Sequence, residues 1–86
     1  MRFRTLGTSK KDYKSLPNEI QEQVDKALRL FAGNPRHPSL QVKKLKGARN
    51  IWEGRISLAY RFTFNWQSDV VTLRRVGTHD ILKKEQ

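Results

Sequence analysis

The clearest regularity in the sequence is a stripe of apolar residues that recurs every three or four positions in the first half of the chain. Its members are Ile20, Val24, Ala27, Leu28 and Phe31. This spacing places them on one face of an α-helix. Pro17 suits the first turn of that helix, and Gly33 followed by Pro35 suits its end. The pattern therefore predicts an amphipathic helix that packs its apolar face against another layer.

A shorter helix is predicted before this one. Arg2–Leu6 has the composition of a short strand, and the helix would follow it and end near position 15. Thr8 or Ser9 can cap its first turn, and the spacing from Ser9 to Asp12 is that of a capping box. Because the two helices adjoin at Leu16–Pro17, they should form a helical hairpin.

After Pro38 the helical spacing gives way to an alternation of apolar and polar residues, which is typical of half-buried strands. The predicted strands are Val42–Lys46, Ile51–Ser57, Ala59–Asn65 and Val70–Val76, with a turn at Trp66–Asp69. Gly77 is expected to end the last strand, and Thr78 to cap a final helical turn that runs to Lys84.

This order of elements favours an α+β fold in one domain over residues 1–86, because no repeat, linker or low-complexity segment divides the chain. Strands joined by short turns pair antiparallel, and the helical hairpin should cover one face of their sheet. The other face is then expected to be exposed and polar. It would carry Arg55 and Arg61 side by side on neighbouring strands.

The charge of the chain indicates what such a polar face would bind. The 86 residues include 18 Lys and Arg but 8 Asp and Glu, for a formal net charge of +10. This charge attracts polyanions, so nucleic acid is the first expected partner and an acidic protein the second. An anionic membrane is disfavoured, since the basic residues do not lie opposite one apolar helical stripe. A basic surface without a specific ligand stays an alternative.

The composition also excludes several classes of protein. The sequence has no cysteine, which excludes a disulfide framework and a thiolate metal site. No apolar stretch approaches the roughly 20 residues of a membrane span, and the first residues form no apolar signal region, so we expect a cytoplasmic protein. There is no Ser-His-Asp pattern, Gly-rich phosphate loop or HExxH motif, and the carboxylates are scattered. We therefore expect no metal and no cofactor.

A set of cations and one imidazole is expected to meet on the polar face. The set comprises Lys43, Lys44, Lys46, Arg55, Arg61, Arg74 or Arg75, and His79. Cleavage of RNA by its own 2′-hydroxyl needs such groups, because arginine pairs with phosphate oxygens and histidine exchanges protons near neutral pH. A lysine among other cations also gives up its proton more readily. The alternative for His79, and more so for His37, is an ordinary surface residue.

Four short motifs, in this order, resemble those of the RelE/ParE superfamily of type II toxins. They are Lys43–Gly47 (KKLKG), Trp52–Ile56 (WEGRI), Tyr60–Phe64 (YRFTF) and Arg75–Asp80 (RVGTHD). The first half agrees, since Lys10–Pro17 and the helix before Asn34 are similar to the helical hairpin of that family. The resemblance covers nearly the whole chain and implies the RelE-like fold, a small antiparallel sheet with the hairpin on one face and a short C-terminal helix.

The resemblance also implies an activity and a set of site residues. Ribonuclease members of the family cut mRNA in the ribosomal A site without a metal. The implied catalytic residues are His79, which resembles the histidine of the YafQ-like branch, Arg61, Arg55, Lys44 and Lys46; the implied RNA-binding residues are Lys43, Arg49, Arg74 and Arg75. The tyrosine that many members carry near the C-terminus is missing here. The identity of the second proton-transfer group is therefore open.

We accordingly predict a metal-independent endoribonuclease toxin without a cofactor. Its partners would be mRNA in the ribosomal A site and a cognate acidic antitoxin that covers Arg55, Arg61 and His79. Two other functions stay open on the same fold: a ParE-like inhibitor of DNA gyrase, and a catalytically inactive relative that binds RNA or an antitoxin.

Overall fold

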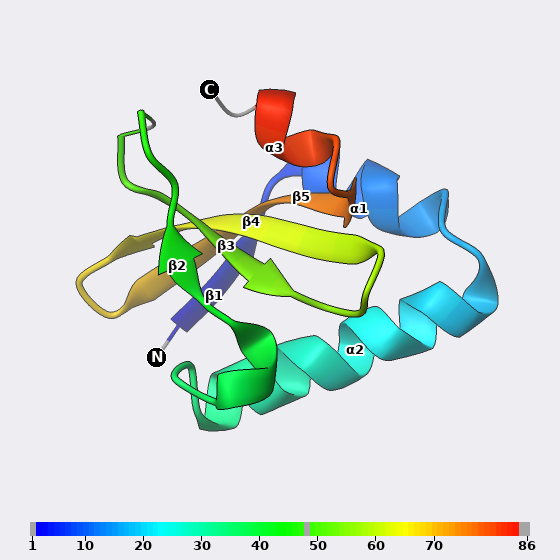
Figure 1. The fold of residues 1–86 in the computed structure, drawn as a ribbon, viewed down its shortest axis with the longest axis horizontal. Helices are drawn as coiled ribbons and strands as arrows, with labels where there is room; N and C mark the ends of the chain where they lie inside the picture. The colour runs from blue at the N-terminus through cyan, green and yellow to red at the C-terminus, as the bar shows by residue number, and fades with distance from the viewer. Residues whose placement is uncertain (1, 48, 85–86) are drawn as a thin grey trace.

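The computed structural model describes residues 2–47 and 49–84 of the chain (Figure 1). Its elements, in chain order, are β1 (Arg2–Thr5), α1 (Gly7–Lys14), α2 (Asn18–Gly33), the 3₁₀ turn η1 (Pro38–Leu40), β2 (Lys43–Lys44), β3 (Ile51–Arg55), β4 (Tyr60–Gln67), β5 (Val70–Thr78) and α3 (Ile81–Lys84). The number and order of the predicted helices are confirmed. None of the helices in the described ranges is long and apolar enough to cross a membrane.

The strands form one five-stranded sheet in the order β1-β5-β4-β3-β2. Strands β2 to β5 pair antiparallel with their neighbours, as predicted from their short connections. The pairing of β1 differs, because β1 lies parallel to β5 at the edge of the sheet. Since β1 leads into a helix and not into a tight turn, no short connection forces it to run antiparallel to its partner. The predicted α+β fold is confirmed, with a mixed sheet.

The two faces of the sheet are covered by different helices, with α2 (cyan) on one side and α3 (red) on the other (Figure 1). The second face of the sheet, opposite α2, was predicted to be exposed, and this prediction was wrong in part. Ile81 and Leu82 of α3 are buried, and Glu53 and Thr63 are buried on the same side of the sheet. A four-residue helix was enough to remove them from water, because its two apolar side chains point towards the strands.

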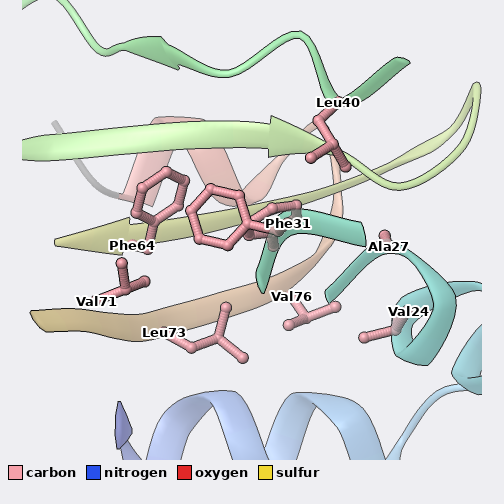
Figure 2. Packing of buried hydrophobic residues seen from close by; sticks show 9 residues of the cluster. Val24, Ala27, Phe31, Leu40, Phe64, Val71, Leu73 and Val76 are labelled. Carbon is pink, nitrogen blue, oxygen red and sulfur yellow. The ribbon is translucent and has the colours of Figure 1, made fainter. Parts of the chain in front are cut away.

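The main core lies between α2 and the sheet (Figure 2). Phe31 of α2 is fully buried, and its ring centroid lies 4.9 Å from that of Phe64 and 5.7 Å from that of Phe62. Ala27 and Val24 are buried one and two turns earlier on the same face of α2. The apolar stripe in the sequence therefore identified the core side of this helix.

Helix α1 lies along the outer edge of β5, beyond the point where β1 ends. Thr8 Oγ1 donates to the carbonyl of Arg74 at 2.8 Å, and the Asp12 carboxylate accepts the backbone N–H of Val76 at 3.1 Å. The same carboxylate receives two hydrogen bonds of 3.0 Å from the Arg75 guanidinium. Side chains of α1 thus satisfy edge groups of β5 that no strand pairs. The predicted cap by Thr8 or Ser9, and the capping box from Ser9 to Asp12, were wrong, since the helix already begins at Gly7 and its N-cap residue is Leu6.

Helices α1 and α2 are also joined directly. The hydroxyl of Tyr13 donates to Asp25 Oδ1 at 2.9 Å, and this hydrogen bond, helped by partial burial, raises the pKa of Tyr13 above its ordinary value. The amide of Gln21 donates to the backbone carbonyl of Tyr13 at 2.8 Å. The predicted hairpin is therefore held by side chains as well as by its short connection.

We expect Asp12→Ala to lower the free energy of unfolding by about 1–3 kcal/mol, because it leaves the buried N–H of Val76 without an acceptor and releases Arg75. Asp12→Asn keeps an acceptor oxygen and should lose less. Urea unfolding of the two variants beside the parent chain measures the difference. Equal urea midpoints for Asp12→Ala and the parent chain would show that the contact of α1 with β5 through Asp12 does not stabilise the fold.

Several predicted strand ends were wrong for reasons of packing. Strand β4 continues to Gln67, so Trp66 lies in the strand and not in the turn. Its ring contacts Phe31, and the guanidinium of Arg36 lies 5.8 Å from its centroid, so the indole has an aromatic and a cationic partner. Strand β5 runs through Gly77 to Thr78, while β2 covers only two residues of the predicted Val42–Lys46.

Candidate functional site

A hollow of about 340 Å³ lies beside α3 at the β2 end of the sheet. Its lining consists of Lys43, Lys44, Leu45, Lys46, Glu53, His79, Leu82 and Lys83. We refer to it as the basic hollow. It unites the three predicted lysines of the β2 region with His79, which follows β5 and is far away in the sequence.

The pairing of β2 with β3 places the lysines at this hollow. Lys43 lies opposite Glu53, and the N–H of Leu45 continues the ladder by donating to the carbonyl of Ile51 at 2.8 Å. After Lys46 the chain turns back through Gly47, whose φ of 78° is in the left-handed region that favours glycine. Lys43 and Lys44 are therefore held on a paired strand, and Lys46 lies just beyond it.

A close approach between β5 and α3 places His79. A Cβ atom on Gly77 would lie 2.8 Å from the side chain of Ile81, so only glycine lets α3 pack this closely. The carbonyl of His79 accepts the N–H of Leu82 at 3.1 Å, which joins His79 to the first turn of α3. The His79 side chain is exposed.

Glu53 is the acidic member of the lining. The residue is 6% exposed, and its Oε1 lies 3.6 Å from Nζ of Lys43. It is part of a row that crosses the sheet in register, from Lys43 through Glu53 and Thr63 to Arg75. In this row, the hydroxyl oxygen of Thr63 is buried and makes no hydrogen bond within the described part of the chain.

The predicted arginine pair is found, but away from the basic hollow. Arg55 and Arg61 lie directly opposite each other on β3 and β4. Nη1 of Arg61 donates to the carbonyls of Ser57 at 2.8 Å and Tyr60 at 3.1 Å, so this guanidinium holds the β3–β4 turn. Arg55 lines a second hollow, of about 260 Å³, against α2. Neither residue lines the basic hollow.

The three remaining predicted arginines occupy separate places. Arg75 is bound by Asp12 at the edge of β5. Arg74 lies at the irregular step in the pairing of β4 with β5 and donates to Oδ1 of Asn65 at 3.1 Å. Arg49 is exposed in the connection from β2 to β3.

The site also contains Glu53 and Lys83, which were not among the predicted catalytic or RNA-binding residues. Alternation with Trp52 was enough to place Glu53 on the second face, but not to show that α3 buries it there. Lys83 could not be identified, because the orientation of α3 depends on its packing over Gly77. Across residues 2–47 and 49–84, no group of three His, Cys, Asp or Glu side chains is arranged to hold a metal ion.

No protein-family model matches this sequence, and no curated protein does. Solved structures do match. A RelB-RelE antitoxin-toxin complex from Methanococcus jannaschii contains a chain with 22% identity and a TM-score of 0.75, over 94% of this chain and 95% of that one. The YoeB/ParE toxin from Agrobacterium tumefaciens has 19% identity and a TM-score of 0.76, over 92% and 99%. YafQ from E. coli strain BL21(DE3) has 15% identity and a TM-score of 0.79, over 95% and 98%.

These likenesses extend over nearly the full length of each chain. They show that this chain has the fold of RelE- and ParE-type toxins, as the resemblance in its motifs implied.

Proposed function

We propose that this chain is the toxin of a type II toxin-antitoxin pair and that it cleaves mRNA on the ribosome. The observation that carries the proposal is the basic hollow, where lysines and a histidine from separate segments surround one space. Its volume of about 340 Å³ falls within the range of small-molecule sites and admits a phosphodiester with its flanking sugars. The fold shared with toxins named RelE, YoeB and YafQ supports the same function.

In the proposed reaction the 2′-hydroxyl oxygen of the RNA attacks the adjacent phosphorus, and the bond from phosphorus to the 5′-oxygen breaks. Negative charge gathers on the phosphoryl oxygens in between. Lys44 and Lys46, with Lys43 as an RNA contact, would stabilise that charge. His79 in its charged form would donate a proton to the leaving 5′-oxygen. The products are a 2′,3′-cyclic phosphate and a 5′-hydroxyl.

The ribosome has a defined part in this proposal. Half of the residues that line the basic hollow are lysines, whose long cationic side chains attract phosphate but do not distinguish bases. Placement of one phosphodiester in the hollow would then depend on how the ribosome holds the mRNA. We therefore expect weak activity on free RNA.

The test compares one mRNA on translating ribosomes with the same mRNA free in solution, both incubated with the purified protein. Cuts in phase with codons, present only with ribosomes and ending in a cyclic phosphate, are expected. A single 2′-deoxy substitution at a cut site should abolish that cut, because it removes the nucleophile. Efficient cutting of free RNA would contradict the proposal. In cells that express the protein, growth arrest with intact mRNA and broken DNA would favour a gyrase inhibitor.

The antitoxin is proposed to be an acidic protein that covers the basic hollow, since the net charge of the chain is +10. Electrostatic steering of this kind raises association rates by about 10–10³-fold and is screened by salt. We expect the association rate constant, measured by stopped-flow fluorescence, to fall about tenfold or more as salt rises from about 0.05 to about 0.5 M. A rate constant independent of salt would contradict this mode of recognition.

A further inference from the structure

We infer that Asn65 of β4 is a positioning residue for the proposed cleavage, because it holds the turn that joins β2 to β3. We call this segment the β2–β3 turn; it contains Lys46, Gly47, Arg49 and Asn50. The inference rests on the proposed function and deepens it, since Asn65 does not line the basic hollow. Asn65 would act through the turn and would not touch the RNA.

The first observation is a pair of hydrogen bonds made by the side-chain amide of Asn65. Its Nδ2 donates to the backbone carbonyl of Asn50 at 2.8 Å, and its Oδ1 accepts from Nη1 of Arg74 at 3.1 Å. Both ends of the amide therefore have partners, which fixes its orientation. Because the donor from Arg74 is charged, it also polarises the amide and makes Nδ2 a better donor to Asn50.

The second observation is the irregular pairing that accompanies Arg74. Thr63 of β4 lies opposite Arg75 of β5. The next residue of β4, Phe64, lies opposite Leu73, so Arg74 is an extra residue of β5 at this step. Such a β-bulge redirects the side chains around it and is common next to active sites. Here it accompanies a guanidinium that reaches an amide nine positions earlier in the chain.

The third observation is the backbone of the β2–β3 turn itself. Strand β2 covers two residues, and the N–H of Leu45 continues its ladder with one hydrogen bond of 2.8 Å to the carbonyl of Ile51. Beyond that bond, Gly47 and Asn50 have left-handed φ values of 78° and 54°. Glycine and asparagine adopt this conformation most readily. The hydrogen bond from Asn65 holds the second of these residues from a strand outside the turn.

The consequence concerns the charge of Lys46, which lines the basic hollow and is exposed. A lysine on a loosely held turn would present its ammonium group at many positions. On a fixed turn the same charge is in place before the RNA arrives, which is the condition for electrostatic stabilisation of the reacting phosphate. The hydrogen bonds of Asn65 would thus fix the backbone that carries Lys46.

The test is Asn65→Asp, which is nearly isosteric, keeps an acceptor for Arg74 and loses the donor to Asn50. Backbone ¹⁵N relaxation of the free protein should show order parameters of Gly47 and Asn50 that fall from about 0.85 to below about 0.6. In single-turnover cleavage of ribosome-bound mRNA, the maximal rate constant should fall about 10–10²-fold, the usual cost of a displacement near 1 Å. The half-saturating ribosome concentration should change much less, which separates positioning from lost RNA binding.

A matched control is available on the same strand. Gln67→Glu makes the same change from amide to carboxylate two residues later, at an exposed position. It should keep the rate constant and the order parameters of the parent chain. If a new negative charge on β4 were enough to repel the RNA, both variants would lose activity equally, and that result would contradict the role of Asn65.

Two further variants perturb the β2–β3 turn at the other end of the hydrogen bond. Asn50→Gly keeps the backbone carbonyl and adopts a left-handed φ without strain, whereas Asn50→Val does not tolerate that φ. Asn50→Val should therefore reproduce the losses of Asn65→Asp, and Asn50→Gly should retain far more activity. Equal rates in the two Asn50 variants would contradict a role for this turn.

The outcomes distinguish this inference from the proposed function. A parent chain that cuts codon-phased sites, beside a folded Asn65→Asp variant with the same rate and order parameters, would overturn the positioning role and leave the function intact. A parent chain without cleavage on the ribosome would overturn the function. Should Asn65→Asp fail to fold in urea unfolding, the comparison of Asn50→Gly with Asn50→Val decides.

Discussion

Replacing His79 with alanine is expected to slow ribosome-dependent mRNA cleavage by about 10²–10⁴-fold, the usual contribution of a general acid or base. The imidazole lies at the basic hollow with its side chain exposed, so its removal withdraws the proposed proton donor without opening the core. Surface substitutions of this kind usually change the free energy of unfolding by no more than about 0.5 kcal/mol. The measurement is the single-turnover rate constant, with urea unfolding to show that the fold persists.

The chain provides a matched control in its second histidine. His37 lies before η1, where its Nδ1 accepts the N–H of Ser39 at 3.2 Å, and it does not line the basic hollow. His37→Ala should therefore cleave at the parent rate. Codon-phased cuts that persist in His79→Ala at the parent rate would assign the proton donation to the lysines. Equal losses in both variants would contradict a specific role for His79.

Replacing Phe31 with alanine is expected to lower the free energy of unfolding by about 3–5 kcal/mol, through lost burial and the cavity left behind. The ring is completely buried, and it contacts four other aromatic rings, those of Phe3, Phe62, Phe64 and Trp66. A chain of this length has a total stability of roughly 4–13 kcal/mol, so the loss is a large share of it and unfolds most of the variant when the parent lies near the lower end.

Urea unfolding followed by tryptophan fluorescence measures this loss, since Trp66 contacts Phe31 directly. Leu58→Ala is the control, because Leu58 is 83% exposed in the β3–β4 turn and its removal should change stability by less than about 0.5 kcal/mol. A loss below about 1 kcal/mol for Phe31→Ala would mean that the aromatic cluster does not form the core.

The structure also changes how the arginines enter the proposed function. The Arg61 guanidinium is occupied by carbonyls of the β3–β4 turn, and that of Arg75 by Asp12. Either residue would have to give up these hydrogen bonds to contact RNA. The lysines of the basic hollow are exposed and need no such exchange, which is why they carry the charge compensation in our proposal.

The sequence by itself determined the elements and the side of each that faces the core. The stripe from Ile20 to Phe31 has the period of a helix, and Phe62 and Phe64 alternate with polar neighbours along β4. Burial follows such periods because side chains on one face of an element meet the same layer. The excess of cations and the lysine and histidine candidates could also be identified from the sequence, since charge and proton exchange are properties of single side chains.

Only the tertiary structure decided which of these residues meet. The parallel edge strand β1, the contact of Asp12 with a strand more than 60 positions later, and the cover of α3 over the second face join segments that no local pattern relates. The same packing placed Glu53 with Lys44 and His79 and left Arg55 and Arg61 outside the hollow. A local period fixes the face on which a side chain lies, but its neighbours across that face depend on register and on which element covers it.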